Sequence, residues 1–204
     1  MIHPIEAASY RILEQRVDLA HLDPGPRAVV ERVIHASADL DYATSMIVGD
    51  AAVRAGVHAL RAGTVVVCDV GMVRRGIRGV PAECYLADNT YSGEERSQLG
   101  PTRAALGMRE AAEQHPVGAV VVVGCAPTAL VEVLDLARRG AFQPALVVGL
   151  PVGFVGAAEA KARLRHSGLP AITNVGEKGG SAVAAAAVNA LTRLATEHRE
   201  GNTP

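Results

Sequence analysis

Three apolar segments in the second half of the chain each run into a loop rich in glycine and proline. They read VVVVGCAPTAL at 120–130, ALVVGLPVGFVG at 145–156 and AITNVGEKGGS at 171–181. Each loop precedes a helical pattern, so its backbone N–H groups and the positive end of the helix dipole suit an anionic ligand. None of the loops carries an obvious nucleophile or general base. They predict where something binds and leave open what happens to it.

A histidine in the first third of the chain is the residue best suited to move a proton. His35 ends an apolar helical stripe, and Asp39 and Asp41 follow it. A helix C-terminus and nearby carboxylates both favour the imidazolium form, which can donate a proton near neutral pH. Spacing alone favours the alternative of a structural histidine that caps helix carbonyls.

Three basic residues are further candidates for contact with an anion. Arg103 opens a predicted helix, where its charge opposes the helix dipole, and we interpret it as aimed at a ligand. Arg75 belongs to a short basic cluster that reads as a solvated turn. Lys161 lies two residues from Glu159, which makes no helical salt bridge, and reads as a surface lysine.

The composition argues against several kinds of partner. The chain has 204 residues and a formal net charge of −1, so it lacks the basic footprint of a nucleic acid-binding protein. No apolar run reaches membrane-spanning length, and no signal-peptide pattern opens the chain. Three cysteines without a CxxC pair fit a reducing compartment. We therefore expect a cytoplasmic protein with no nucleic acid or membrane partner.

Cofactor and metal motifs are also missing from the sequence. The spacing of Gly149, Gly153 and Gly156 differs from the dinucleotide fingerprint, and no P-loop or GxSxG elbow occurs. The seven histidines include no i,i+4 pair with a helper carboxylate. We expect neither a metal nor a cofactor.

The elements that must position these residues follow an alternating pattern. Strands are predicted at 64–69, 82–86, 119–124, 145–149 and 171–174, separated by helices. This pattern indicates an α/β fold with a doubly wound, flavodoxin-like, parallel five-stranded sheet in three α/β/α layers. We expect one domain over 1–204, with an all-helical lead-in at 1–62, the parallel core at 63–197 and a flexible tail at 198–204.

Several short motifs, taken in order, resemble those of the precorrin-8X methylmutase (precorrin isomerase) family of cobalamin biosynthesis. The most specific is the PVGFVGAAEAK block at 151–161, and the KGGS block at 178–181 is moderately specific. The others are IHASAD at 34–39, CDVGMVRRGI at 68–77, TRAA at 102–105 and APTAL at 126–130. The resemblance covers about residues 5–194.

The resemblance implies a homodimer that uses no metal or dissociable cofactor. It implies an isomerase that moves a methyl group from C-11 to C-12 of precorrin-8X, or of a cobalt-containing equivalent, to give hydrogenobyrinic acid. The catalytic histidine of the family falls on His35, as proton donor for a 1,5-sigmatropic shift. Substrate contacts fall on Ser9, Arg103, Ala126, Pro127, Thr128, Gly153, Phe154, Val155, Lys178, Gly179, Gly180 and Ser181, with Arg75 as a further candidate.

The chain departs from the family pattern at three positions. Cys125 replaces an asparagine, Glu177 replaces an arginine beside an expected anion site, and Ala38 stands where glycine is common. A non-catalytic corrinoid carrier on the same scaffold is the alternative function. A tetrapyrrole chelatase is disfavoured by the sparse histidines.

Overall fold

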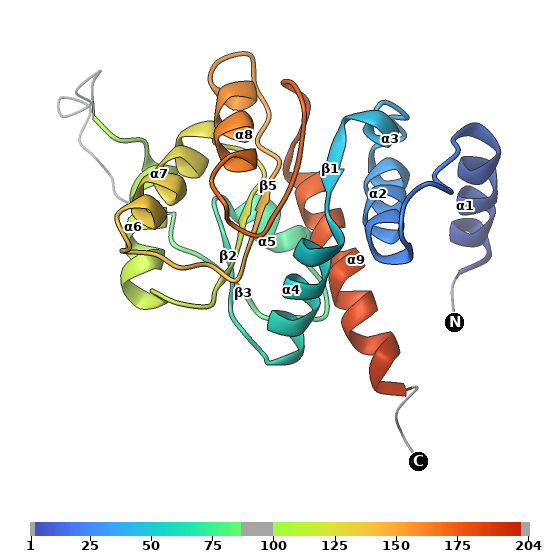
Figure 1. The fold of residues 1–204 in the computed structure, drawn as a ribbon, viewed down its shortest axis with the longest axis horizontal. Helices are drawn as coiled ribbons and strands as arrows, with labels where there is room; N and C mark the ends of the chain where they lie inside the picture. The colour runs from blue at the N-terminus through green and yellow to red at the C-terminus, as the bar shows by residue number, and fades with distance from the viewer. Residues whose placement is uncertain (1–2, 87–99, 201–204) are drawn as a thin grey trace.

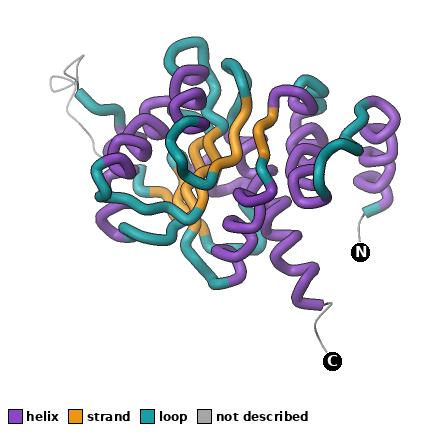
Figure 2. Tube along the Cα trace, viewed as in Figure 1, coloured by secondary structure: helices purple, strands orange, loops and turns teal. Residues whose placement is uncertain are grey.

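A six-stranded sheet runs through the centre of the protein, in a computed structural model that describes residues 3–86 and 100–200 (Figure 1, Figure 2). The spatial order of its strands is β1-β6-β5-β4-β2-β3. The strands are β1 (Met46–Val48), β2 (Val66–Cys68), β3 (Ala82–Cys84), β4 (Val120–Val123), β5 (Leu146–Gly149) and β6 (Ala171–Asn174).

The sheet is mixed, so the prediction of five parallel strands is wrong. The five predicted strands pair in parallel, but β1 adds a sixth strand that runs antiparallel to β6, with Met46 opposite Asn174. The segment 1–62 is therefore not an all-helical lead-in. Three residues between two helices are too short to show alternation, and their strand conformation depends on the distant partner β6.

Nine helices occur in the described part of the chain. The short α3 was not predicted, and α5 was predicted only as a turn. Helix α9 continues to Glu200, three residues into the expected tail, and 201–204 lie outside the described residues. The helices are α1 (Pro4–Arg16), α2 (Pro24–Ser37), α3 (Tyr42–Ser45), α4 (Asp50–Arg61), α5 (Gly71–Gly76), α6 (Arg103–Gln114), α7 (Pro127–Arg138), α8 (Ala157–Arg165) and α9 (Ser181–Glu200).

Strands β2, β4 and β5 bury both of their faces, which explains their unbroken apolar runs. Successive side chains of a strand point to opposite faces. Val120 and Val122 accordingly pack with α2, α4, α5 and α9, whereas Val121 and Val123 pack with α6, α7 and α8. The result is a helical layer on each face of the sheet (Figure 1).

Helix α1 lies at the edge of the molecule and packs against α2 (Figure 1). Leu13 is its buried residue, while Ile5 and Ile12 are exposed. Within the part of the chain that the structure describes, no helix is both long and apolar enough to cross a membrane.

Candidate functional site

The three glycine-rich loops follow β4, β5 and β6, so they meet at the carboxyl edge of the sheet. The strand order reverses between β2 and β4: β2 leads into α5 on one face, and β4 leads into α7 on the other. Ligands of open α/β sheets bind in the crevice at such a switch point. The fold therefore brings the predicted loops to the edge where a ligand is expected.

A buried carboxylate occupies this switch point. Asp69 follows β2 and is 1% exposed. Its carboxylate accepts hydrogen bonds from the backbone N–H of Gly124 at 3.1 Å, of Cys125 at 2.8 Å and of Ala126 at 2.8 Å. Burial raises the pKa of Asp69, and these N–H bonds oppose the rise. The protein's own carboxylate thus fills the anion-binding turn of the first loop.

This arrangement corrects the sequence prediction for the first loop. The N–H of Ala126 was expected to donate to a ligand carboxylate, but Asp69 already takes it. Pro127 has no N–H to offer. Of this loop's predicted contacts, Thr128 lies exposed in the first turn of α7, where backbone N–H groups lack helical partners.

The second and third loops clasp each other. Gly153 donates its N–H to the carbonyl of Glu177 at 3.2 Å, and Gly180 donates to the carbonyl of Leu150 at 2.9 Å. A Cβ on Gly179 would lie 2.3 Å from the Leu150 carbonyl oxygen, so only glycine allows this approach. The N–H groups of Gly153 and Gly180 are therefore used inside the protein and do not face a ligand.

A buried lysine anchors the third loop by hydrogen bonds. Lys161 on α8 has no exposed surface. Its Nζ donates to Asn174 Oδ1 at 3.0 Å and to the Lys178 carbonyl at 2.6 Å. Burial, followed by repulsion from Arg165, lowers the pKa of Lys161 to about 8. The prediction of a surface lysine is wrong, because the distant partners Asn174 and Lys178 satisfy its ammonium group.

The side chain of Lys178 joins the third loop to the segment that follows α2. Its Nζ donates to Asp39 Oδ2 at 2.7 Å and to Asp41 Oδ2 at 2.6 Å. These hydrogen bonds raise the pKa of Lys178 and lower the pKa of Asp39. The contact brings the end of α2, and with it His35, to the carboxyl edge of the sheet.

His35 lies in the last turn of α2 and is partly buried. Its Nδ1 is hydrogen-bonded to Ser9 Oγ at 2.9 Å. The ring of Tyr10 stacks on its imidazole, with ring centroids 4.9 Å apart and planes inclined by 11°. Ser9 and His35, to which the family resemblance assigns separate roles, are thus in direct contact. The backbone turns at Ala38, which has φ of 55° in the left-handed region that favours glycine.

Arg103 lies on the other face of the sheet from His35. It begins α6 directly after the N-cap residue Thr102, whose Oγ1 lies 2.6 Å from Thr128 Oγ1 at the start of α7. Arg103 is exposed, as are Phe154 at 91% and Val155 at 87% in the second loop. Arg75 is an exposed residue in the last turn of α5.

Sequence reasoning missed two residues of this edge, Asp69 and Tyr10. The signal for Asp69 was a carboxylate directly after a buried parallel strand at a switch point. The sequence held no comparable signal for Tyr10, because its partner lies 25 positions away on another helix. Over the described residues, no three His, Cys, Asp or Glu side chains gather in a way that could hold a metal ion.

The fold and the edge together define an α/β protein whose sheet has a switch point between β2 and β4, with His35 hydrogen-bonded and stacked at the end of α2. The model of the precorrin-8X methylmutase family matches residues 4–194. The chain belongs to this family, whose members are isomerases of cobalamin biosynthesis that move a methyl group within their substrate.

Individual relatives agree with this assignment. A cobalt-precorrin-8 methylmutase of Priestia megaterium is 40% identical over 94% of this chain and 87% of its own length. A precorrin-8X methylmutase of Pseudomonas aeruginosa is 39% identical over 90% of this chain and 91% of its own. The crystal structure of a precorrin-8X methylmutase from Thermus thermophilus is 36% identical, with a TM-score of 0.84 over 96% of this chain and 99% of its own.

Proposed function

We propose that this chain converts precorrin-8X to hydrogenobyrinic acid by moving a methyl group from C-11 to C-12 of the macrocycle. His35 donates a proton to the conjugated ring, which lowers the barrier to migration. An isomerisation has no net proton change, so His35 takes a proton back when the product forms. The observation that carries this role is the Ser9–His35 hydrogen bond at the end of α2.

The carboxyl edge offers the right surfaces for a macrocycle with acidic arms. Phe154 and Val155 present apolar side chains that a flat ring would cover. Arg103 supplies positive charge for the acetate and propionate arms, whereas Asp39 and Asp41 already pair with the charge of Lys178. The first turns of α7 and α9 offer N–H groups near Thr128 and Ser181, beside the small residues Gly179 and Gly180.

The working form in this proposal is a homodimer. Side chains as exposed as Phe154 and Val155 are costly in water unless a ligand or a second copy covers them. Both lie in the second loop, next to the proposed substrate crevice. A second copy would therefore close the crevice and exclude water from the reacting ring.

Identity to relatives does not choose between a metal-free and a cobalt-containing substrate. The Priestia megaterium and Pseudomonas aeruginosa proteins are named for different substrates, yet they are 40% and 39% identical to this chain. Both forms of the substrate therefore belong in the assay.

The test mixes the purified protein with precorrin-8X, and in parallel with cobalt-precorrin-8, and follows the absorption change to product. We expect conversion by the wild type and a loss of roughly two to four decades in kcat for His35→Ala. Full activity of His35→Ala would refute the proton-donor role. Tight binding of the product without any conversion by the wild type would favour the corrinoid carrier instead.

A further inference from the structure

The two residues that contact His35 approach it from different directions. Ser9 and Tyr10 are consecutive on α1, so their side chains diverge by about 100° around the helix. Ser9 reaches the edge of the imidazole at Nδ1, whereas Tyr10 covers one face of the ring. Each contact restrains a different degree of freedom.

The stacked Tyr10 ring fixes the plane of the His35 imidazole, and the hydrogen bond fixes which edge of the imidazole faces Ser9. Rotation about χ2 of histidine is soft and roughly two-fold, so a half-turn exchanges the two edges but leaves the plane unchanged. A half-turn of the imidazole therefore leaves its stacking on Tyr10 unchanged. The bond to Ser9 excludes the half-turn but tolerates a tilt of the ring. Only both contacts together give His35 one orientation.

This orientation selects the nitrogen that releases the proton. In the doubly protonated ring, Nδ1–H can only donate, and Ser9 Oγ can accept from it. The remaining N–H, on Nε2, points away from Ser9, because the two N–H groups of an imidazole diverge. The proton that His35 can deliver to a substrate is therefore the one on Nε2.

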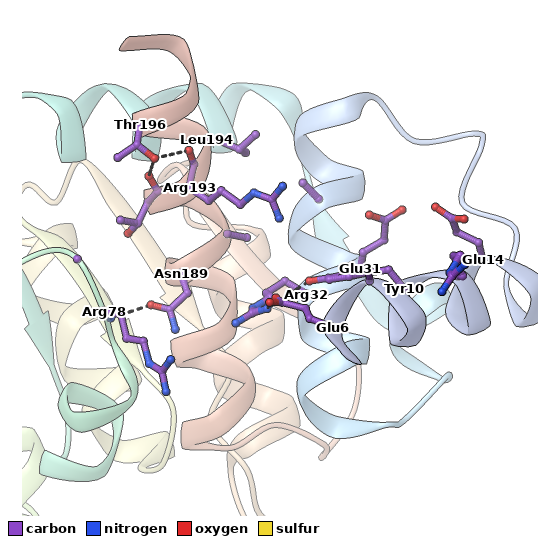
Figure 3. A pocket seen from close by; sticks show the side chains of 16 residues that line it. Glu6, Tyr10, Glu14, Glu31, Arg32, Arg78, Asn189, Arg193, Leu194 and Thr196 are labelled. Atoms are coloured by element: carbon purple, nitrogen blue, oxygen red, sulfur yellow. Dashed lines mark hydrogen bonds and ion pairs between the residues drawn. The ribbon is translucent and has the colours of Figure 1, made fainter. Parts of the chain in front are cut away.

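Tyr10 is itself held in place by charged neighbours. Arg32 on α2 donates from Nη1 to the Tyr10 hydroxyl at 3.4 Å and to Glu6 Oε1 on α1 at 2.5 Å. Figure 3 shows Glu6, Tyr10 and Arg32 together on α1 and α2. They line one side of an open groove of about 920 Å³, and residues of α9 line its other side. The ion pair thus ties the two helices together beside the stacked rings.

We propose that Tyr10 is a positioning residue for the reaction: its ring sets the plane of the His35 imidazole so that the Nε2 proton meets the substrate in one direction. The proposal rests on the proposed function of His35. In this proposal, α1 orients the imidazole of the proton donor His35. Ser9, which the family resemblance made a substrate contact, here selects the nitrogen.

The first experiment compares steady-state kinetics of wild type, Tyr10→Leu and Tyr10→Phe with precorrin-8X. Leucine removes the ring face, and phenylalanine keeps it. A misplacement of about 1 Å can slow a reaction about 100-fold, so we expect Tyr10→Leu to lower kcat about 10- to 100-fold with KM within about twofold. Tyr10→Phe should restore kcat to within about threefold. Ile12→Ala, on the exposed side of α1, is the control and should match wild type.

The second experiment observes His35 in the free protein by NMR, with its signals assigned by their absence in His35→Ala. The ring of Tyr10 should shift the His35 ring protons upfield in wild type and in Tyr10→Phe, and this shift should vanish in Tyr10→Leu. In Ser9→Ala the upfield shift should persist, while the imidazole should lose its single orientation about χ2. Should Tyr10→Leu detach α1, seen as lost helical signal, Tyr10→Met takes its place.

The outcomes separate the two hypotheses. A wild-type kcat in Tyr10→Leu, together with loss of the upfield shift, overturns the positioning role of Tyr10. No upfield shift in the wild type overturns the stacking geometry. If the wild type forms no product, the proposed function fails. The restraint of the His35 ring by Tyr10 is then tested by NMR alone: broadened or doubled His35 signals in Tyr10→Leu support it, and single sharp signals overturn it.

Discussion

The buried ammonium of Lys161 makes the stability of this protein depend on pH in a defined way. Its pKa in the folded protein is about 8, below the ordinary value of 10.5. Between these two pH values the unfolded chain binds more protons than the folded chain, so stability rises with pH through this window. The variant Lys161→Met lacks this titration and keeps an apolar stem of similar length.

The size of the effect follows from the two pKa values. Linkage with pKa values of about 8 and 10.5 makes the free energy of unfolding rise by about 1 kcal/mol between pH 7 and pH 9, and by about 2–3 kcal/mol by pH 10. The wild type should gain this much relative to Lys161→Met, whatever their difference at pH 7. Urea unfolding followed by circular dichroism at pH 7, 8, 9 and 10 measures it.

The other lysine of the chain provides a matched control. The pKa of Lys178 is raised by Asp39 and Asp41, so both the folded and the unfolded protein keep this lysine protonated until the pH nears 10.5. The difference between wild type and Lys178→Met should stay flat from pH 7 to about 10 and shrink above it. A flat or falling difference for Lys161→Met would refute the idea that its ammonium is desolvated in the fold.

Two further predictions concern the turns of the carboxyl edge. Asp69→Asn should lower the free energy of unfolding by about 2–4 kcal/mol in urea titrations, because an amide cannot accept all three N–H bonds without turning a donor toward them; wild-type stability would contradict this account. Gly179→Ala should lower Tm and raise KM, because its Cβ would meet the carbonyls of Leu150 and Pro151, whereas Gly71→Ala meets nothing within 4 Å. Equal Tm values for the two alanine variants would show that the close backbone contact between the second and third loops does not require glycine at position 179.

The core of the sheet could be predicted because its signal is local. Four consecutive valines at 120–123 already indicate a strand buried on both faces, and the structure confirms it. Strand β1 has no such signal, since Met46–Val48 becomes a strand only by pairing with β6. The backbone hydrogen bond from the Val175 N–H to the Ser45 carbonyl has no local signal either, because the two residues are 130 positions apart in the sequence.

The site could be predicted only in part, for the same physical reason. The loops and His35 carry local patterns, and the resemblance placed Ser9 at the N-terminus. The roles of Asp69, Tyr10 and Lys161 depend on partners that are distant in sequence or on another element. Sequence spacing relates Lys161 only to its neighbour Glu159. It does not indicate that α8 directs the Lys161 side chain toward β6.

The satisfied groups at the carboxyl edge restrict how a polyanionic substrate can bind. Asp69 neutralises the turn after β4, and Asp39 and Asp41 outnumber the single charge of Lys178. The end of the crevice near His35 therefore offers little net attraction for carboxylates. Under the proposed function, the acidic arms lie away from this end, and Arg103, on the opposite face of the sheet, is the cation that the family resemblance assigns to them. The macrocycle then extends across the switch point toward Nε2 of His35, where an uncharged part of the ring meets the proton donor without competition from its own carboxylates.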